Sequence, residues 1–414
     1  MNDGSVFAVT RSRLLAAALL AGTFAAGEAV AQGRVVITNM SVEDCKEMGS
    51  CEWKLSCKVG GGAETELVAG AVAASPAEVQ LNKAFEDQKF PLTVRCSVWE
   101  DDGMVGASWG EPATGSITLP AGGDYELDLT SAKQGAVKVL LIADSLEMAG
   151  ASAAKAVPAA AKAPGKSATR RYTGLFRATK GGHAVVVGLD AASFRKKVDA
   201  LAKQGVQLTD LEVLDEGGKR QWSGVFQTRE GGGTLITDLE WEPFLERWKD
   251  LTEQKGMRLI DLETYDDGKK RMFAGAFAES DDLYSLWVGM DRKAFESKWA
   301  ELSGQGLRLI DVEVYRAGNQ TLYSGVFLAG RGGYGMWSDL GWDDLRGKWK
   351  NAGTQLVDFD SYVDGGKRRY AAATGAKGPK EALEASLDAA TFATRWREQA
   401  AKGYRLMHLE SYTE

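Results

Sequence analysis

Acidic pairs that recur through the C-terminal half are the residues best placed to do chemistry in this 414-residue chain. The members of each pair stand two residues apart in a strand-like stretch, so both side chains project from one face of the strand. The pairs are Asp210/Glu212, Asp261/Glu263, Asp311/Glu313, Asp358/Asp360 and His408/Glu410. Such a face could bind a cation or a basic ligand, and its candidate residues are Asp261, Glu263, Asp311 and Glu313. The alternative is a role in the fold, through pairing with Arg220, Arg271, Arg368 and backbone amides.

Motifs for nucleophilic or nucleotide chemistry are weak. Ser193–Lys196 has the Ser-x-x-Lys spacing of a β-lactamase-like nucleophile, but a recurring core position follows the serine and no Lys-Thr-Gly motif accompanies it. Gly330–Gly335 has dinucleotide-binding spacing but lies between two expected strands, where we predict a hairpin connection. Neither histidine, His183 or His408, belongs to a zinc-binding or serine-hydrolase motif. We therefore expect a non-catalytic protein.

The acidic pairs belong to a unit of about fifty residues that recurs five times between Arg170 and the C-terminus. Each unit has a helix-like segment with a large apolar residue and an apolar partner four positions later. These are Phe194/Val198, Phe244/Trp248, Phe295/Trp299, Leu345/Trp349 and Phe392/Trp396. A strand with an aromatic-x-Gly-x-Phe pattern keeps the same spacing, with Ala372 and Thr374 in place of Gly and Phe in its fifth copy.

We predict that each unit runs from this patterned strand through a hairpin loop to a second strand, then a helix and a third strand. Asp190, Asp291 and Asp388 are expected N-caps, and a glycine ends each helix. Turn signals join each third strand to the next patterned strand. Pairing of 406–412 with 171–176 would then remove two exposed strand edges, which favours a closed, five-bladed, propeller-like ring over an open solenoid.

Two tryptophans add a second kind of candidate binding residue. Trp287 and Trp337 stand outside the shared aromatic positions of the repeat, as do Trp241 and Trp342. Exposed on one face, they could grip an extended glycan or peptide. The alternative is burial between units.

The N-terminal part has a different pattern. Residues 1–31 resemble an export signal, with Arg11 and Arg13 before an apolar run and Ala29-Val-Ala31 as a cleavage site. Short alternating strands at 53–59, 92–99, 115–119, 125–129 and 137–142 predict an all-β sandwich over 34–148. The Ala/Lys/Pro-rich segment 149–169 predicts a linker to a repeat domain over 170–414. The expected fold class is therefore mixed, a β-sandwich followed by an α+β repeat domain of β-β-α-β units.

All four cysteines lie in the predicted sandwich, which fits an oxidising compartment and two disulfides. Strand alternation places Cys57 and Cys96 on the core faces of two strands, so we expect them to pair. Cys45 and Cys51 would then close a short loop. A zinc ion held by all four thiolates is the alternative, although paired Cys-x-x-Cys spacing is missing.

The stretch from Phe244 to Phe277 carries Phe-x-x-x-Trp, then Gly-x-Arg-Leu-Ile-Asp-Leu-Glu-x-Tyr, a glycine turn and an aromatic-x-Gly-x-Phe strand. It resembles the bacterial tandem repeat domain family, which forms the N-terminal part of polyglycine hydrolases and related secreted serine hydrolases. His408 departs from the usual aspartate. In those proteins a separate β-lactamase-like domain is catalytic, and this chain has no room for one.

The stretch from Val94 to Gly103, followed by 115–119, is similar to the segment of C2 domains that carries a calcium loop. That resemblance implies Ca²⁺ as the one cofactor to consider, with Glu43, Asp44, Glu100, Asp101 and Asp102 as ligands. The alternative is a solvated acidic turn.

Net charge narrows the range of partners. A formal charge of -7 argues against a nucleic-acid partner, and no apolar run after the signal is long enough to cross a bilayer. We therefore expect a secreted or periplasmic binding protein that recognises a carbohydrate, a peptide or a cell-envelope partner through the repeats. The alternatives are an accessory or degenerate member of a secreted serine hydrolase system and a calcium-dependent membrane-docking protein.

Overall fold

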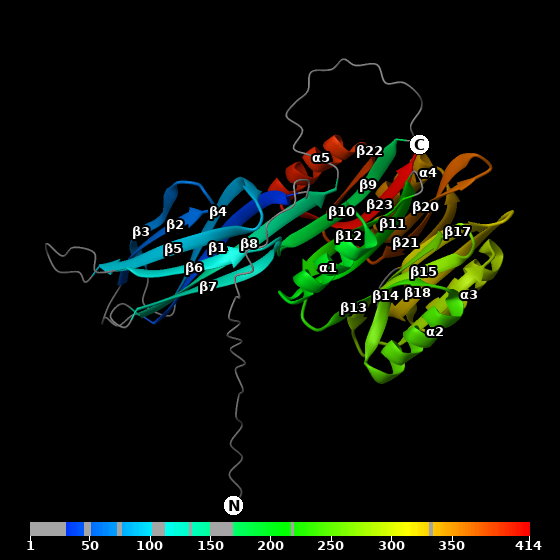
Figure 1. Cartoon of the computed structure of the whole chain (residues 1–414), viewed down its shortest axis with the longest axis horizontal. Helices are drawn as coiled ribbons and strands as arrows, with labels where there is room; N and C mark the ends of the chain where they lie inside the picture. Colours follow the sequence, from blue (N-terminus) through cyan, green and yellow to red (C-terminus); the bar gives the residue numbers. More distant parts are fainter. Residues whose placement is uncertain are drawn as a thin grey trace, which may run out of the picture.

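The computed structural model describes residues 30–44, 51–72, 77–101, 112–131, 135–149, 169–216, 219–330 and 334–414. Within these residues the fold is mixed and mainly β, with an N-terminal sandwich followed by small sheets that each carry one helix (Figure 1). Nearly all of the predicted signal (1–31) and linker (149–169) lies outside the described residues.

The sandwich confirms the strands predicted within 34–148. One sheet contains β1 (Gln32–Asp44), β4 (Ala77–Lys89), β7 (Gly123–Ser131) and β8 (Gly135–Met148). The other has the order β3 (Glu64–Val72), β2 (Cys51–Val59), β5 (Leu92–Asp101) and β6 (Ala113–Leu119). Trp53, Leu55 and Val94 are buried between the sheets. Strands β1, β3 and β4 went unpredicted, and β4 shows why, since its side chains are half-buried or exposed and give no apolar alternation.

The predicted pairing of Cys57 with Cys96 is confirmed. The two residues face each other across β2 and β5, with their Cα atoms 4.1 Å apart, and their sulfurs are bonded. The predicted Cys45–Cys51 bridge lies outside the described residues, since Cys45 and the side chain of Cys51 are not described.

The repeat region forms three-stranded antiparallel sheets in which one helix follows the outer strand. The first has β10 (His183–Leu189), α1 (Ala191–Ala202), β11 (Val206–Glu216) and β12 (Lys219–Thr228); the second has β13 (Gly233–Leu239), α2 (Trp241–Lys249), β14 (Met257–Asp266) and β15 (Arg271–Glu279). A π-helical turn, η1 (Asp250–Gln254), extends α2. The third has β16 (Tyr284–Met290), α3 (Arg292–Gly304), β17 (Leu307–Ala317) and β18 (Gln320–Ala329).

Two further sheets complete the series. The fourth has β19 (Gly335–Leu340), α4 (Trp342–Ala352), β20 (Gln355–Asp364) and β21 (Lys367–Gly375). The fifth joins β22 (Glu381–Leu387), α5 (Ala389–Ala401) and β23 (Tyr404–Thr413) to β9 (Arg170–Ala178) from the start of the repeats. The predicted pairing of 406–412 with 171–176 is therefore confirmed.

One predicted connection is wrong. The patterned strand does not pair with the strand that follows it, because the two edges of β12, for example, are already occupied by β10 and β11. The loops at Gly231–Gly233 and after Gly330 therefore lead to the outer strand of the next sheet instead of closing hairpins. The structural unit is accordingly outer strand, helix, inner strand and middle strand.

The helix signals in the sequence are confirmed. Asp190, Asp291 and Asp388 each accept a hydrogen bond from the amide three residues later, as N-caps do. The glycines after the helices have positive φ, from 63° at Gly256 and Gly353 to 87° at Gly306. The recurring apolar helix residues, Phe194, Phe244, Phe295, Leu345 and Phe392, are at most 1% exposed.

The sandwich and the repeat region share a sheet. The C-terminal end of β8 pairs in parallel with β10, so the sandwich extends the first repeat sheet at its outer edge. Asp144 of β8 is fully buried at this junction. Its carboxylate lies 3.0 Å from His183 Nδ1 and 3.0 Å from Arg405 Nε, and these residues belong to the first and fifth sheets.

A glycine in the middle strand receives the ring of the helix phenylalanine. A Cβ added at Gly275 would lie 3.2 Å from Phe244 Cζ and 2.5 Å from Leu259 Cδ1. In the fourth sheet Ala372 replaces this glycine and Leu345 replaces the phenylalanine. The smaller leucine leaves room for the alanine methyl, so the two departures compensate each other.

We predict that Gly275→Ala lowers the free energy of unfolding by about 1–3 kcal/mol through overpacking. The same change in a Phe244→Leu background should cost less, because that pair reproduces the fourth sheet. Denaturant unfolding of the single and double variants measures the coupling. Gly347→Ala, at a position with open space around its Cβ inside α4, is the control and should be neutral or stabilising. Additive costs would contradict the account.

Candidate functional site

The inner strands bring the acidic pairs together in two layers. The first layer is Asp210, Asp261, Asp311, Asp358 and His408; the second is Glu212, Glu263, Glu313, Asp360 and Glu410. The inner strands contact one another in the order β11, β14, β17, β20 and β23, and β23 also contacts β11. Each has a register shift immediately before its first-layer residue, a local irregularity that re-aims a side chain.

First-layer carboxylates bond to the backbone of the neighbouring sheet. Asp261 Oδ2 accepts from the Leu211 amide at 3.0 Å, and Asp311 Oδ2 accepts from the Leu262 amide at 3.2 Å. The same bond runs from Val312 to Asp358 (2.7 Å) and from Leu409 to Asp210 (3.0 Å). These side chains therefore provide hydrogen bonds between neighbouring sheets whose inner strands are not paired with each other through the backbone.

The second layer repeats this arrangement with more varied donors. Glu313 Oε1 accepts from the Thr264 amide at 2.9 Å and from its hydroxyl at 2.8 Å. Serine hydroxyls donate to Glu410 and Glu212, from Ser361 and Ser411 respectively. The amide pairing that the sequence suggested as a role in the fold is therefore present.

The predicted arginine partners are wrong. Arg220, Arg271 and Arg368 stack instead on tyrosines that end the next inner strand, with guanidinium carbons 4.0, 4.6 and 3.6 Å from the rings of Tyr265, Tyr315 and Tyr412. The three arginines lie near the start of the middle strands, outside the two acidic layers. Each therefore connects its own sheet to the next one through a cation–π contact.

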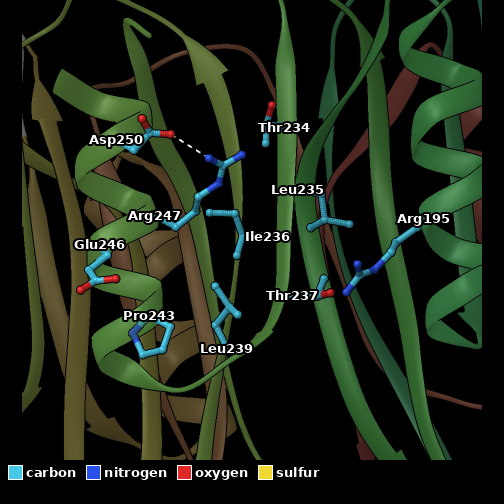
Figure 2. A pocket seen from close by; sticks show the side chains of 10 residues that line it. All are labelled: Arg195, Thr234, Leu235, Ile236, Thr237, Leu239, Pro243, Glu246, Arg247 and Asp250. Carbon is cyan, nitrogen blue, oxygen red and sulfur yellow. Dashed lines mark hydrogen bonds and ion pairs between the residues drawn. The ribbon is translucent and has the colours of Figure 1, made fainter. Parts of the chain in front are cut away.

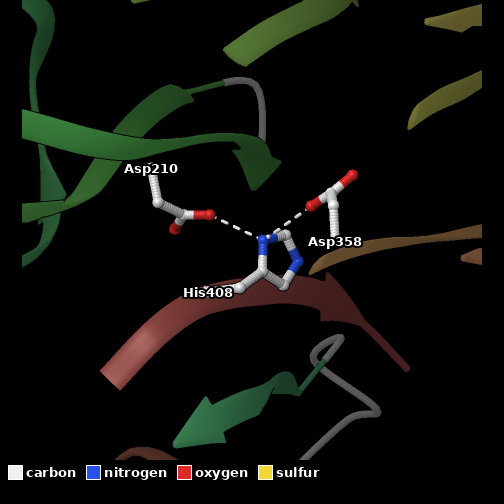
Figure 3. A group of neighbouring side chains, drawn as sticks. All are labelled: Asp210, Asp358 and His408. Carbon is white, nitrogen blue, oxygen red and sulfur yellow. Dashed lines mark hydrogen bonds and ion pairs between the residues drawn. The ribbon is translucent and has the colours of Figure 1, made fainter. Parts of the chain in front are cut away.

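His408 is the one basic side chain among the ten residues of the two layers. Its Nδ1 lies 2.6 Å from Asp210 Oδ1 and 2.9 Å from Asp358 Oδ1 (Figure 3). Burial by itself would lower the pKa of His408, but these two carboxylates outweigh burial and hold it well above its ordinary value. The two carboxylates therefore favour the protonated imidazole, whose Nδ1 lies between them.

Burial also dominates the acids. It raises the pKa of Glu263, with Glu313 and Glu212 adding repulsion, and it raises the pKa of Asp360 to about 6. The pKa of Asp261, Asp311, Glu212, Glu313 and Glu410 is likewise raised well above the ordinary value, with desolvation as the largest cause. Burial and mutual repulsion therefore favour the protonated form of these carboxyl groups.

We predict that the protein is less stable at pH 8 than at pH 5. A group whose pKa is raised in the folded state favours folding below its unfolded pKa and loses that contribution as the pH rises through its folded pKa. The window opens near the ordinary values of 3.8 to 4.5 and extends past about 6, the raised pKa of Asp360. Denaturant unfolding at the two pH values measures the effect.

Glu263→Gln keeps the shape of the side chain but cannot ionise. We expect it to raise the free energy of unfolding at pH 8 by about 1 kcal/mol or more and to flatten the pH dependence. Glu242→Gln, at an exposed position of α2, is the matched control and should change neither. Lower stability of Glu263→Gln at pH 8 would contradict the proposed repulsion.

The structure separates the two kinds of predicted ligand-binding residue. Trp287 lies on β16 and Trp337 on β19, both outer strands, whereas the acids lie on inner strands across the middle strand. Trp287 is 36% exposed, with Lys298 Nζ 4.1 Å from its ring, and Trp337 is half-buried. The tryptophans and the acids therefore do not form one site.

The calcium hypothesis stays a prediction. Glu43 and Asp44 lie at the end of β1, and Glu100 and Asp101 at the end of β5, but none of their side chains is described. Asp102 lies outside the described residues.

Ser193, the serine of the Ser-x-x-Lys motif, caps a helix. Its amide and its hydroxyl both donate hydrogen bonds to the capping carboxylate of Asp190.

A groove of about 620 Å³ lies over β13, between α1 and α2 (Figure 2). Its apolar lining is Leu235, Ile236, Leu239 and Pro243, and its polar lining is Thr234, Thr237, Arg195, Glu246, Arg247 and Asp250. Arg195 reaches in from α1 and bonds to Asp238 at 2.9 Å, while Arg247 bonds to Asp250 at 2.7 Å. Sequence reasoning missed this groove.

Comparison of the units explains why the groove is open. Ile236 faces Gly275, as Trp287 faces Gly325 and Trp337 faces Ala372, so the three residues are equivalent. The first and fifth units have Val186 and Glu384 at this position. In the third and fourth units a lysine of the helix lies over the tryptophan, at 4.1 and 6.0 Å. Arg247 is the equivalent of these lysines, three residues after Phe244, but Ile236 gives it no ring to cover. Aligning the units would have revealed this difference.

The model of a protein family described as "Polyglycine hydrolase-like, structural repeat" matches residues 183–229, 284–328 and 378–414. These segments correspond to β10–β12, β16–β18 and β22–β23, and they are similar to the structural repeat of that family. The family resemblance predicted from the sequence is confirmed over these residues. No curated protein matches the chain.

Solved structures are similar at low identity. A C2 domain of plant Extended Synaptotagmin 1 is 13% identical, and the match covers 28% of this chain and 95% of that domain with a TM-score of 0.20. Human GIVD cytosolic phospholipase A2 is 10% identical, with a TM-score of 0.22 over 68% of this chain. The match spans 37% of the phospholipase chain.

Among the described residues no helix is both long and apolar enough to span a membrane.

Proposed function

We propose that the chain is an exported, non-catalytic binding protein whose five repeat sheets close into a ring that holds a peptide-binding groove. Closure is supported by the pairing of β9 with β23, by the contact of β11 with β23 and by the bond from the Leu409 amide to Asp210. In this arrangement the acidic layers serve as the internal support of the ring. Ligands are then met at the outer strands and helices.

The open groove over β13 carries the proposal. Its floor is aliphatic, and its sides hold two arginines that are each already paired with an acid. In the next two units the equivalent position is filled by a tryptophan with a cation over its ring. The groove thus has the shape and chemistry to accept an aromatic side chain from outside, with Arg247 stacking on it.

An extended peptide with one aromatic residue fits this groove better than a glycan. The aromatic side chain of the peptide would lie beside β13, which is the outer strand of its sheet. Among the described residues β13 pairs with β15 on one edge and with no strand on the other. An unpaired strand edge can also bond to a peptide backbone. The corresponding edge of β10 already pairs with β8 of the sandwich, which shows that outer strands of this kind accept an added strand.

The test is peptide binding by the whole mature protein. Peptides selected from a random heptapeptide library are measured by fluorescence polarisation, each beside a version with its aromatic residue changed to alanine. Ile236→Trp fills the groove from within and should weaken binding at least tenfold. Leu283→Trp, at a site that is 74% exposed outside the groove, is the control and should bind as the unaltered protein does.

Unchanged binding by Ile236→Trp would overturn the proposed groove. Selection of peptides without aromatic residues would also overturn it. If glycans bind in place of peptides and Ile236→Trp abolishes that binding, the groove stands and the peptide assignment is wrong.

The family match gives the hydrolase alternative a specific test. We expect no labelling of the purified protein by fluorophosphonate or penicillin-type probes, because Ser193 is engaged in the cap of α1. Mass spectrometry of the treated protein measures the adduct. Labelling at Ser193 that Ser193→Ala removes would contradict the non-catalytic assignment.

A further inference from the structure

Three groups of the first layer meet closely enough to share one ion. One carboxylate oxygen each of Asp210 and Asp358 and a ring nitrogen of His408 all lie within 4.8 Å of one another, and all three residues are buried (Figure 3). The residues come from β11, β20 and β23, so the site exists only when three sheets assemble.

A neighbouring carboxylate has an unused oxygen. Asp261 is 6% exposed, and its Oδ2 accepts from the Leu211 amide, which follows Asp210 on β11. Its Oδ1 is buried without a hydrogen-bond partner. An unsatisfied buried carboxylate oxygen is costly, and here it belongs to the same layer as the three clustered groups.

The chemistry of the three groups selects the kind of ion. Two carboxylate oxygens and one imidazole nitrogen are typical ligands of Zn²⁺, which takes four ligands and leaves one position for water or a further oxygen. Calcium needs six to eight oxygens and does not suit this set. His408 is the one basic side chain among the five first-layer residues.

We propose that Asp210, Asp358 and His408 bind one Zn²⁺ ion, in the layer that also contains the unpartnered oxygen of Asp261. The metal takes the position of the Nδ1 proton of His408, and that proton leaves to solvent. The ion then connects the first, fourth and fifth sheets through its coordination bonds. Without the ion, the contacts of His408 Nδ1 with Asp210 and Asp358 connect the same sheets. This site is independent of the groove over β13, so each can fail alone.

The whole mature protein is stripped with chelator, dialysed and titrated with ZnCl₂ by calorimetry, and bound metal is counted by elemental analysis. We expect one equivalent of Zn²⁺ and a rise in the thermal midpoint. His408→Ala and Asp358→Asn should each weaken binding at least tenfold. Asp281→Asn, an exposed carboxylate elsewhere in the repeats, and Asp101→Ala with Asp102→Ala in the sandwich should bind as the unaltered protein does.

Two measurements guard against variants that fail to fold. Co²⁺ titration of the unaltered protein should produce visible absorption bands of a site with mixed oxygen and nitrogen ligands. His408→Asp, which restores the residue type of the other first-layer positions, should fold and shift the preference from Zn²⁺ towards Mn²⁺. The proposal is overturned if the unaltered protein binds no stoichiometric Zn²⁺ or Co²⁺, or if folded His408→Ala and Asp358→Asn keep full affinity.

Discussion

Buried carboxylates that accept backbone amides from the adjacent sheet are the interaction on which the repeat region depends. A unit of about fifty residues buries too little surface to fold alone, so each sheet must be stabilised by its neighbours. The inner strands approach one another without a continuous ladder, and Asp261, Asp311, Asp358 and Asp210 supply the bonds between them. Stacked arginine–tyrosine pairs such as Arg220 and Tyr265 reinforce the same contacts at the rim.

This solution has an electrostatic cost. Desolvation and mutual repulsion raise the pKa of Glu263 and its neighbours, so the layers are most favourable when some of the acids are protonated. His408 offsets part of the repulsion by standing where the other units place aspartate. Its position between Asp210 and Asp358 makes the contact between the fifth sheet and its neighbours chemically different from the others. His408 is therefore the one residue of the first layer that departs from aspartate.

The outer-strand position that faces the middle-strand glycine or alanine also varies between units, and the groove lies where it is Ile236. The five residues at this position are Val186, Ile236, Trp287, Trp337 and Glu384. A repeat protein acquires a distinct site when one copy departs from the others, because the shared positions are occupied in maintaining contacts between units. The compensating pair Ala372 and Leu345 is a departure of the other kind, since it preserves the packing. The junction at Asp144 further ties the first and fifth sheets to the sandwich.

The sequence by itself determined the local structure. The spacing of Phe244 and its equivalents, the N-cap aspartates and the glycines with positive φ depend on neighbours a few residues away, and all were predictable. The Cys57–Cys96 bridge was predictable too, because strand alternation sets both side chains on the core side. Tertiary structure decided which strands share a sheet, which amide meets each carboxylate and where Arg220 points. Those outcomes depend on contacts between residues far apart in the chain, and one register shift before each acid is enough to redirect its side chain.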